Sequence, residues 1–406
     1  MEQLNPKRLF YGSCFALITT AFSFSIRAGI LPQLAERFQL DAVQLGTINL
    51  MWFLGFPISM VLGGIFYAAI GPKRIMQFAL FAHAVGILLT IYSGGYIGLL
   101  ISTLFIGLAN GCTEAACNPM IATMYTGKTM NTLLNRFHMW FPGGIFVGSI
   151  ISFFMTKMEL GWEAQIWVIL IPTVIYAYLF FGQKFPETPK EASSIGNNLK
   201  AMISPLFLFI SACMFLTAIS EFGPSQWATL VLAKSGAEPM LIVALTFGLM
   251  AIGRYFGGEF VHRFDQTGVL LGSAVITLIG IFLLSSQTGP MAYVAAIVFG
   301  MGVCYFWPNM IGFVAEKIPA SGATGMSIVG ACGMFSNAVF QRIIGGWIEN
   351  GKEKAAALGL QGDAAELAAG QATLQTMMIF PAILIVLFTI LLFWVRRRQS
   401  VAVATH

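Results

Sequence analysis

Long apolar segments recur roughly every 30 residues along this chain, and this recurrence constrains the fold more than any other feature. Of the 406 residues, 57% are hydrophobic and 10% are charged. Soluble domains carry about 25% charged residues, which cover their surface. Each apolar segment matches the length of about 20 residues that a helix needs to cross a bilayer. We therefore predict an all-α polytopic membrane protein, and we exclude a soluble enzyme or a nucleic-acid binder.

The apolar segments form two sets of six, which predicts twelve transmembrane helices in two pseudo-symmetric six-helix bundles. The most polar internal stretch, which begins at Lys184, separates the two sets and is typical of a linker. An Ala-rich stretch at 350–370 is predicted to form a short helix outside the membrane. The expected domains are 1–183, the linker 184–202, 203–398 and a tail at 399–406. The expected spans are 9–34, 43–70, 75–94, 97–123, 136–156, 163–183, 203–230, 239–262, 268–287, 290–315, 322–348 and 371–395.

The positions of Lys and Arg predict the orientation in the membrane. With the N-terminus inside, fourteen of the 22 basic residues fall in cytoplasmic segments and five fall in the opposite segments. Loops rich in Lys and Arg stay in the cytoplasm. We therefore expect a multi-pass protein of the inner (plasma) membrane, a monomer in the lipid bilayer, with both termini cytoplasmic.

The two halves share a pattern at a fixed offset of 194 residues. Gly63 and Gly64 correspond at this offset to Gly257 and Gly258. Two six-helix halves joined by a polar linker are typical of transporters built from parallel repeats. With these features the chain resembles the major facilitator superfamily over nearly its full length. The resemblance implies two bundles around a central cavity and transport by alternating access.

The loop between the second and third spans is similar to the signature G-x-x-x-D-x-x-G of that superfamily. Gly64, Gly71, Lys73 and Arg74 stand at matching places, whereas Ala68 replaces the acidic residue. The resemblance implies a gating role for Lys73 and Arg74. In the second half, we expect gating residues at the corresponding end of the bundle, namely Arg254 and Glu259.

Ionisable residues inside the spans are the first candidates for function, because they are costly in a membrane and usually face a cavity or a partner. Asn110, Glu114 and Asn118 are spaced by four, so they share one helix face. This stripe is expected either to line a transport cavity or to hydrogen-bond between helices as packing glue. A shielded Glu114 is a candidate proton carrier.

The residues from Glu114 to Pro119, E-A-A-C-N-P, resemble a motif of the fucose–proton symporter-like sugar permeases. The stretch from Asn131 to Gly144 also looks like the entry of the fifth span in that subfamily. The resemblance implies that Glu114 belongs to the proton-coupling and sugar-binding apparatus. In the first span this chain departs from the subfamily, because Ala28 stands where an acidic residue is expected.

Arg27 and Glu221 occupy equivalent places in the first and seventh spans, since the offset of 194 residues maps one onto the other. Gly29 and Pro32 follow Arg27, and a Gly-Pro pair follows Glu221, so both helices are expected to be interrupted near a binding site or gate. Three roles remain open for Arg27. The first role is an ion pair with Glu114 or Glu221, and the second is to anchor a substrate carboxylate or phosphate. The third is to extend toward the outer surface of the membrane.

Further polar and aromatic residues of the spans complete the expected site. Those assigned to the substrate cavity beside Arg27, Asn110, Asn118 and Glu221 are Gln226, Trp227, Asn309 and Asn337. Further candidates are His138, Gln341 and Arg342.

The sequence therefore predicts a secondary active transporter for proton-coupled uptake of a sugar or sugar derivative. One alternative is symport or antiport of an organic or sugar-acid anion anchored by Arg27. Another is a non-transporting membrane receptor on the same scaffold. We expect no enzymatic activity, no cofactor and no metal site. The expected partners are a small solute, protons and the lipid bilayer, and no nucleic acid.

Overall fold

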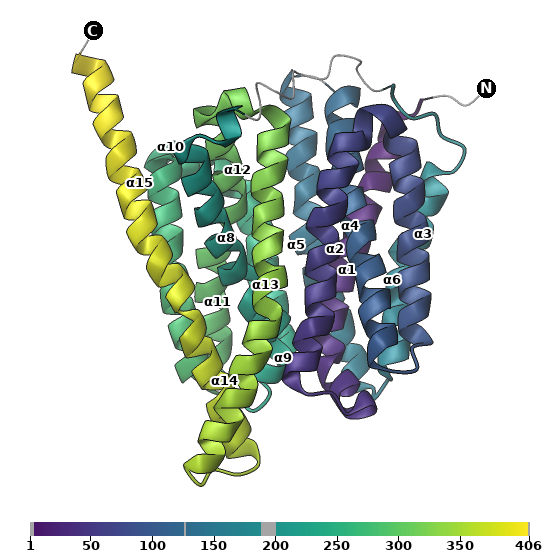
Figure 1. Cartoon of the computed structure of the whole chain (residues 1–406), viewed down its shortest axis with the longest axis vertical. Coiled ribbons are helices and arrows are strands. Elements are labelled where there is room, and N and C mark those ends of the chain that lie inside the picture. Colours follow the sequence, from purple (N-terminus) through teal and green to yellow (C-terminus); the bar gives the residue numbers. More distant parts are fainter. Residues whose placement is uncertain (1–3, 126, 188–199, 405–406) are drawn as a thin grey trace.

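The computed structural model describes residues 4–125, 127–187 and 200–404, and the elements within these ranges are helical. They form two groups of long helices that stand side by side (Figure 1). The first bundle consists of α1 (Pro6–Phe38), α2 (Ala42–Ile70), α3 (Pro72–Ile91), α4 (Tyr96–Met124), α5 (Gly127–Lys157) and α6 (Trp162–Phe180). The second consists of α8 (Pro205–Gln226), α9 (Ala228–Val231), α10 (Pro239–Ser286), α11 (Met291–Val303), α12 (Phe306–Lys317), the 3-10 turn η1 (Pro319–Ser321), α13 (Gly322–Ala357), α14 (Asp363–Met377) and α15 (Ile379–Ala404).

Local sequence chemistry determines where several of these helices begin. The side chain of Asn5 accepts a hydrogen bond from the Arg8 N–H at 3.0 Å, and proline follows it at the first helical position of α1. Asp41 and Gln44 form a reciprocal capping box at the start of α2. Such caps satisfy backbone N–H groups that have no partner inside the helix.

The predicted fold class is confirmed. Eleven helices among the described residues are long and apolar enough to span a membrane, and the segment Pro239–Tyr255 is a shorter apolar helix. Two expected spans, 239–262 and 268–287, both lie in α10. They are separated by Asp265, whose φ of 54° and ψ of 165° break the helical path. The expected span 290–315 is divided into α11 and α12 at Cys304 and Tyr305.

The stretch at 350–370 is not a single short helix, as the sequence suggested. Helix α13 runs on to Ala357, and α14 begins at Asp363 after a short turn. The two helices pack against each other as a hairpin beyond the rest of the bundle (Figure 1).

The expected interruptions of two helices are also corrected. Helix α1 is continuous through Pro32, and α8 continues through Pro224 to Gln226. A proline lacks the N–H that would bond to the carbonyl four residues earlier. Pro32 therefore frees the carbonyl of Ala28, and the hydroxyl of Thr229 donates to this carbonyl at 2.5 Å. Neighbouring helices can satisfy the freed backbone group in this way, so the helix need not break.

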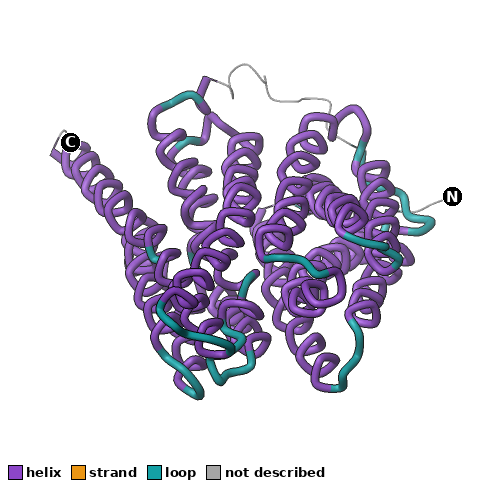
Figure 2. Tube along the Cα trace, turned by 60° about the horizontal axis from the view of Figure 1, so that its bottom comes forward, coloured by secondary structure: helices purple, strands orange, loops and turns teal. Residues whose placement is uncertain are grey.

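The bundles meet along two pairs of helices, α2 with α13 and α5 with α10. Both ends of the chain lie at the same end of the molecule, whereas α9 and the α13–α14 hairpin lie toward the other end (Figure 1). Figure 2 shows the two groups of helices from a view in which this second end comes forward. We call it the distal end.

Candidate functional site

A buried ion pair in the second bundle forms the centre of the candidate site. An Nη atom of Arg254 on α10 lies 3.4 Å from a carboxylate oxygen of Glu221 on α8. The Glu221 side chain is 2% exposed and the Arg254 side chain is 14% exposed. Arg254 Nε also donates to the carbonyl of Cys304 at 3.1 Å, at the break between α11 and α12. This break presents a backbone acceptor that holds the guanidinium in place.

The first bundle contributes a histidine and a carboxylate to the same region. His138 on α5 interacts electrostatically with Glu114 on α4 and with Arg254 across the bundle boundary. A carboxylate oxygen of Glu114 accepts a hydrogen bond from Asn118 Nδ2 at 2.6 Å, and both side chains are half-buried. We call Glu114, His138, Glu221 and Arg254 the central charge cluster. It joins ionisable groups from both bundles.

An aromatic cluster fills the space beside these charges. Phe222 directly follows Glu221, and its ring contacts aromatic rings of both bundles at centroid distances of 5.5–6.5 Å. Its partners are Phe24, Phe53 and Phe141 of the first bundle and Phe247 and Trp307 of the second. The bundles therefore touch through apolar rings that can slide or separate without breaking hydrogen bonds.

Polar contacts join the bundles at the distal end. Besides the bond from Thr229 to Ala28, a carboxylate oxygen of Glu349 accepts from the Ala42 N–H at 3.0 Å. Lys157 at the end of α5 forms an ion pair with Glu238 at the start of α10. The backbones of α2 and α13 also approach closely here. They are so close that a Cβ atom on Gly345 would collide with the Ala42 carbonyl. The structure is therefore closed at this end.

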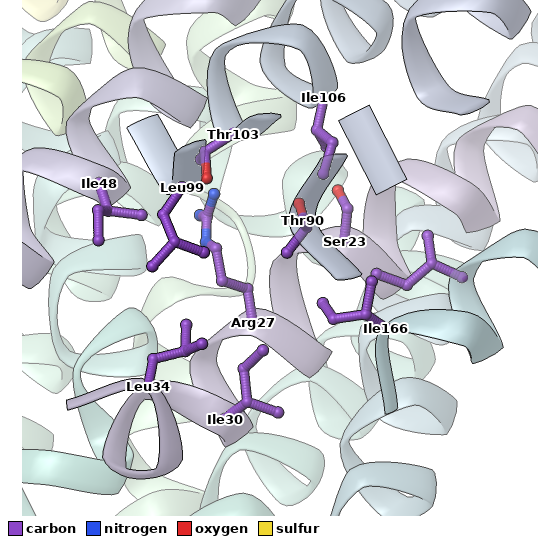
Figure 3. Close-up of a pocket in the computed structure, with 11 residues that line it drawn as sticks. Ser23, Arg27, Ile30, Leu34, Ile48, Thr90, Leu99, Thr103, Ile106 and Ile166 are labelled. Atoms are coloured by element: carbon purple, nitrogen blue, oxygen red, sulfur yellow. The ribbon is translucent and has the colours of Figure 1, made fainter. Parts of the chain in front are cut away.

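Arg27 lies inside the first bundle, apart from the central charge cluster. Its side chain is 5% exposed, and its guanidinium points into a small cavity with Ser23, Thr90 and Thr103 on its walls (Figure 3). Its nitrogen atoms form no hydrogen bond with any described residue. Of the three expected roles, the structure thus shows neither an ion pair with Glu114 or Glu221 nor an approach to the outer surface.

The polar stripe on α4 divides into two parts. Asn110 points into the first bundle, where its Nδ2 donates to Ser23 Oγ at 3.2 Å and its Oδ1 bonds to His83 Nε2 at 2.8 Å. The other ring nitrogen of His83 lies 2.9 Å from the hydroxyl of Tyr176. Asn110 therefore forms hydrogen bonds that join helices within the first bundle, whereas Glu114 and Asn118 belong to the region between the bundles.

The remaining expected cavity residues lie mainly on the second bundle. Trp227 Nε1 donates to Gln341 Oε1 at 2.8 Å. The amide of Gln226 is buried and has no hydrogen-bond partner among the described residues. Asn309 and Asn337 donate to backbone carbonyls four residues earlier in their own helices. Arg342 is exposed.

The expected gating residues are not gathered in one place. Lys73 and Arg74 are exposed in the first turn of α3. Arg254 instead takes part in the central charge cluster. The side chain of Glu259 lies outside the described residues.

Sequence reasoning missed the aromatic cluster and the bond from Thr229 to Ala28. Phenylalanine occurs 36 times in the chain, so its abundance could not indicate which rings meet at the bundle boundary. The position of Pro32 could have indicated the second feature, because a proline inside a long helix always frees one carbonyl.

Comparisons with known proteins agree with this architecture. The family described as the Major Facilitator Superfamily matches residues 13–341. The chain is 27% identical to the hexuronate transporter of Bacillus subtilis (strain 168) over 183 residues, which cover 43% of this chain but only 41% of that relative. It is 22% identical to the 3-(3-hydroxy-phenyl)propionate transporter of Escherichia coli (strain K12) over 325 residues, which cover 75% of this chain and 78% of the relative.

Solved structures share the fold at low sequence identity. A bacterial homologue of the human lysosomal transporter Spinster superposes with a TM-score of 0.77 at 14% identity, covering 94% of this chain and 96% of that one. A D-xylose-proton symporter gives 0.72 at 13% identity, covering 92% and 97%. The transporter FucP in its outward conformation gives 0.59 at 17% identity, covering 92% and 98%.

Two helical bundles with long apolar helices define a polytopic all-α membrane architecture. The chain belongs to the Major Facilitator Superfamily.

Proposed function

We propose that this protein is a proton-coupled transporter that takes up a sugar or sugar derivative across the inner membrane by alternating access. The central charge cluster carries the proposal, because it joins ionisable groups of both bundles at their boundary. The amides of Gln226 and Gln341 supply hydrogen-bond donors and acceptors of the kind that sugar hydroxyls require. The D-xylose-proton symporter with the same fold supports this choice of substrate class and coupling ion.

In this mechanism Glu114 carries the proton. It is half-buried and therefore accessible, whereas Glu221 is enclosed with its partner Arg254. Protonation of Glu114 removes a negative charge that acts on His138, and His138 in turn interacts with Arg254 of the other bundle, so the balance of charges across the bundle boundary changes. A ligand shifts a conformational equilibrium only by its differential affinity for the two states. Coupling follows if proton and sugar both favour the state in which the distal end is closed.

A second candidate function is transport of an organic or sugar-acid anion. The positions of the two arginines favour Arg254 over Arg27 as its anchor, since Arg254 lies at the bundle boundary and Arg27 faces the interior of one bundle. The names of the relatives from Bacillus subtilis and Escherichia coli, which are transporters of acids, also support this candidate.

Uptake into proteoliposomes distinguishes the two candidates. Radiolabelled neutral hexoses and sugar acids are offered with and without an inward proton gradient. Gradient-stimulated uptake of a neutral sugar supports the first candidate. Uptake limited to acids, lost in Arg254→Gln and retained in the exposed control Arg37→Gln, supports the second. Uptake of a solute without any dependence on the gradient contradicts proton coupling.

A further inference from the structure

The cavity beside Arg27 is separate from the proposed transport site. Side chains from α1, α2, α3, α4 and α6 enclose it, so it belongs entirely to the first bundle (Figure 3). Its volume is about 10 Å³. This is about the space that one water molecule needs in a protein interior, and it also suits a monatomic ion.

The cavity contains a positive charge without a carboxylate partner among the described residues. The guanidinium of Arg27 forms no hydrogen bond there, and its described neighbour is the ring of Trp52, whose centroid lies 5.1 Å from the guanidinium carbon. An aromatic ring compensates a buried cation only in part. Arginine does not lose its proton in proteins, so burial without an anion is costly.

Acidic side chains of the first bundle do not supply the missing charge. Glu114 bonds to Asn118 and faces the bundle boundary. Glu36, Asp41 and Glu159 are exposed at the surface. Glu163 is half-buried in the first turn of α6, but it does not line the cavity and forms no hydrogen bond with Arg27.

The walls of the cavity suit a small anion. In Figure 3 the hydroxyl of Thr103 lies beside the guanidinium. The hydroxyls of Ser23 and Thr90 donate to carbonyls of their own helices, and most other wall residues are isoleucine or leucine. Arginine is more weakly hydrated than an ammonium group and readily binds an anion in an apolar setting. We propose that Arg27 and Thr103 bind one chloride ion inside the first bundle.

This site would stabilise the closed distal end. Ala28, the residue after Arg27, supplies the carbonyl that accepts the inter-bundle hydrogen bond from Thr229. An ion that holds Arg27 in place also fixes this turn of α1. The proposal does not depend on which solute the protein transports.

Thermal unfolding of the purified full-length protein in detergent tests the proposal. Sodium chloride is compared with sodium gluconate at equal ionic strength, because gluconate is too large for the cavity. We expect the melting temperature to rise with chloride and to saturate, with bromide acting similarly. Arg27→Gln should remove the difference between the two salts, and the exposed control Arg342→Gln should retain it. Equal melting temperatures in chloride and gluconate would mean that water alone occupies the cavity, and would overturn the proposal.

Two further measurements keep the test valid if Arg27→Gln does not fold. Chloride-35 NMR on the wild-type protein should show line broadening that excess bromide reverses. Thr103→Val keeps the shape of the side chain but removes its hydroxyl, and it should raise the half-saturating chloride concentration about fivefold, as expected for one lost hydrogen bond. Absence of bromide-sensitive broadening, or an unchanged half-saturating concentration in Thr103→Val, contradicts the proposed site.

Discussion

Arg27 and Arg254 are both enclosed by membrane helices, yet their surroundings differ. Arg254 has Glu221 at 3.4 Å and a backbone carbonyl at 3.1 Å, and it lies near groups of the other bundle. Arg27 has no hydrogen-bond partner among the described residues and faces the interior of its own bundle. The repeat offset pairs Arg27 with Glu221, so the two halves use equivalent positions differently. The position of a buried charge relative to the bundle boundary therefore decides which role it can serve.

The largest expected effect comes from removing one partner of the ion pair. Glu221→Gln leaves Arg254 without its carboxylate, and we expect a loss of about 3 kcal/mol in the free energy of unfolding. Denaturant or thermal unfolding in detergent measures this. The double variant Glu221→Gln/Arg254→Gln should recover at least half of the loss. Arg27→Gln in chloride-free buffer should cause no comparable loss. A double variant that is less stable than both single variants would contradict the pairing.

A smaller loss is expected inside the first bundle. His83→Ala leaves the buried Asn110 Oδ1 and the Tyr176 hydroxyl without their partner, which should lower the free energy of unfolding by about 2 kcal/mol. The dependence of transport on pH should remain unchanged in the folded protein, because His83 lies outside the central charge cluster. His138→Ala is the matched comparison and should alter that dependence. A changed pH dependence of transport in His83→Ala, together with an unchanged one in His138→Ala, would refute the assignment of His83 to packing and of His138 to function.

The bond between Thr229 and the Ala28 carbonyl should influence the balance between conformations. Thr229→Val removes the hydroxyl donor, at a cost of about 1 kcal/mol to the closed distal end. The ratio of conformations should shift about fivefold toward opening at this end. Distances between spin labels placed across the distal end measure this ratio, and Thr229→Ser serves as the control. Equal distance distributions for the valine and serine variants would remove this bond from the account.

The smallest effect is expected at the exposed ion pair between Lys157 and Glu238. Lys157→Ala should shift the conformational ratio by less than about 1 kcal/mol, because exposed pairs contribute little, and high salt should abolish the shift. The control is Lys234→Ala, because Lys234 and its partner Asp363 both belong to the second bundle and their ion pair does not join the two bundles. This control should leave the ratio unchanged. A shift that persists in high salt would show that Lys157 acts through something other than its charge.

The sequence predicted the fold well, because the length of an apolar segment alone decides whether a helix can cross a membrane. It also singled out Glu114 and Glu221, because a carboxylate within a span is costly and usually faces a cavity or a partner. It could not indicate that Arg254 pairs with Glu221 or that Arg27 faces inward. Those outcomes depend on how each helix is rotated, and packing against its neighbours sets that rotation. Pro32 led to the wrong prediction of an interrupted helix, because the sequence could not show that Thr229 of the second bundle satisfies the carbonyl that this proline frees.

The most direct test of the account is to separate proton coupling from solute binding in Glu114→Gln. Proteoliposomes containing this variant or the wild type are assayed for gradient-driven uptake and for exchange of solute without a gradient. If Glu114 carries the proton, the variant loses gradient-driven uptake by at least tenfold but retains exchange. If the gradient still drives uptake in Glu114→Gln as in the wild type, Glu114 does not carry the coupled proton.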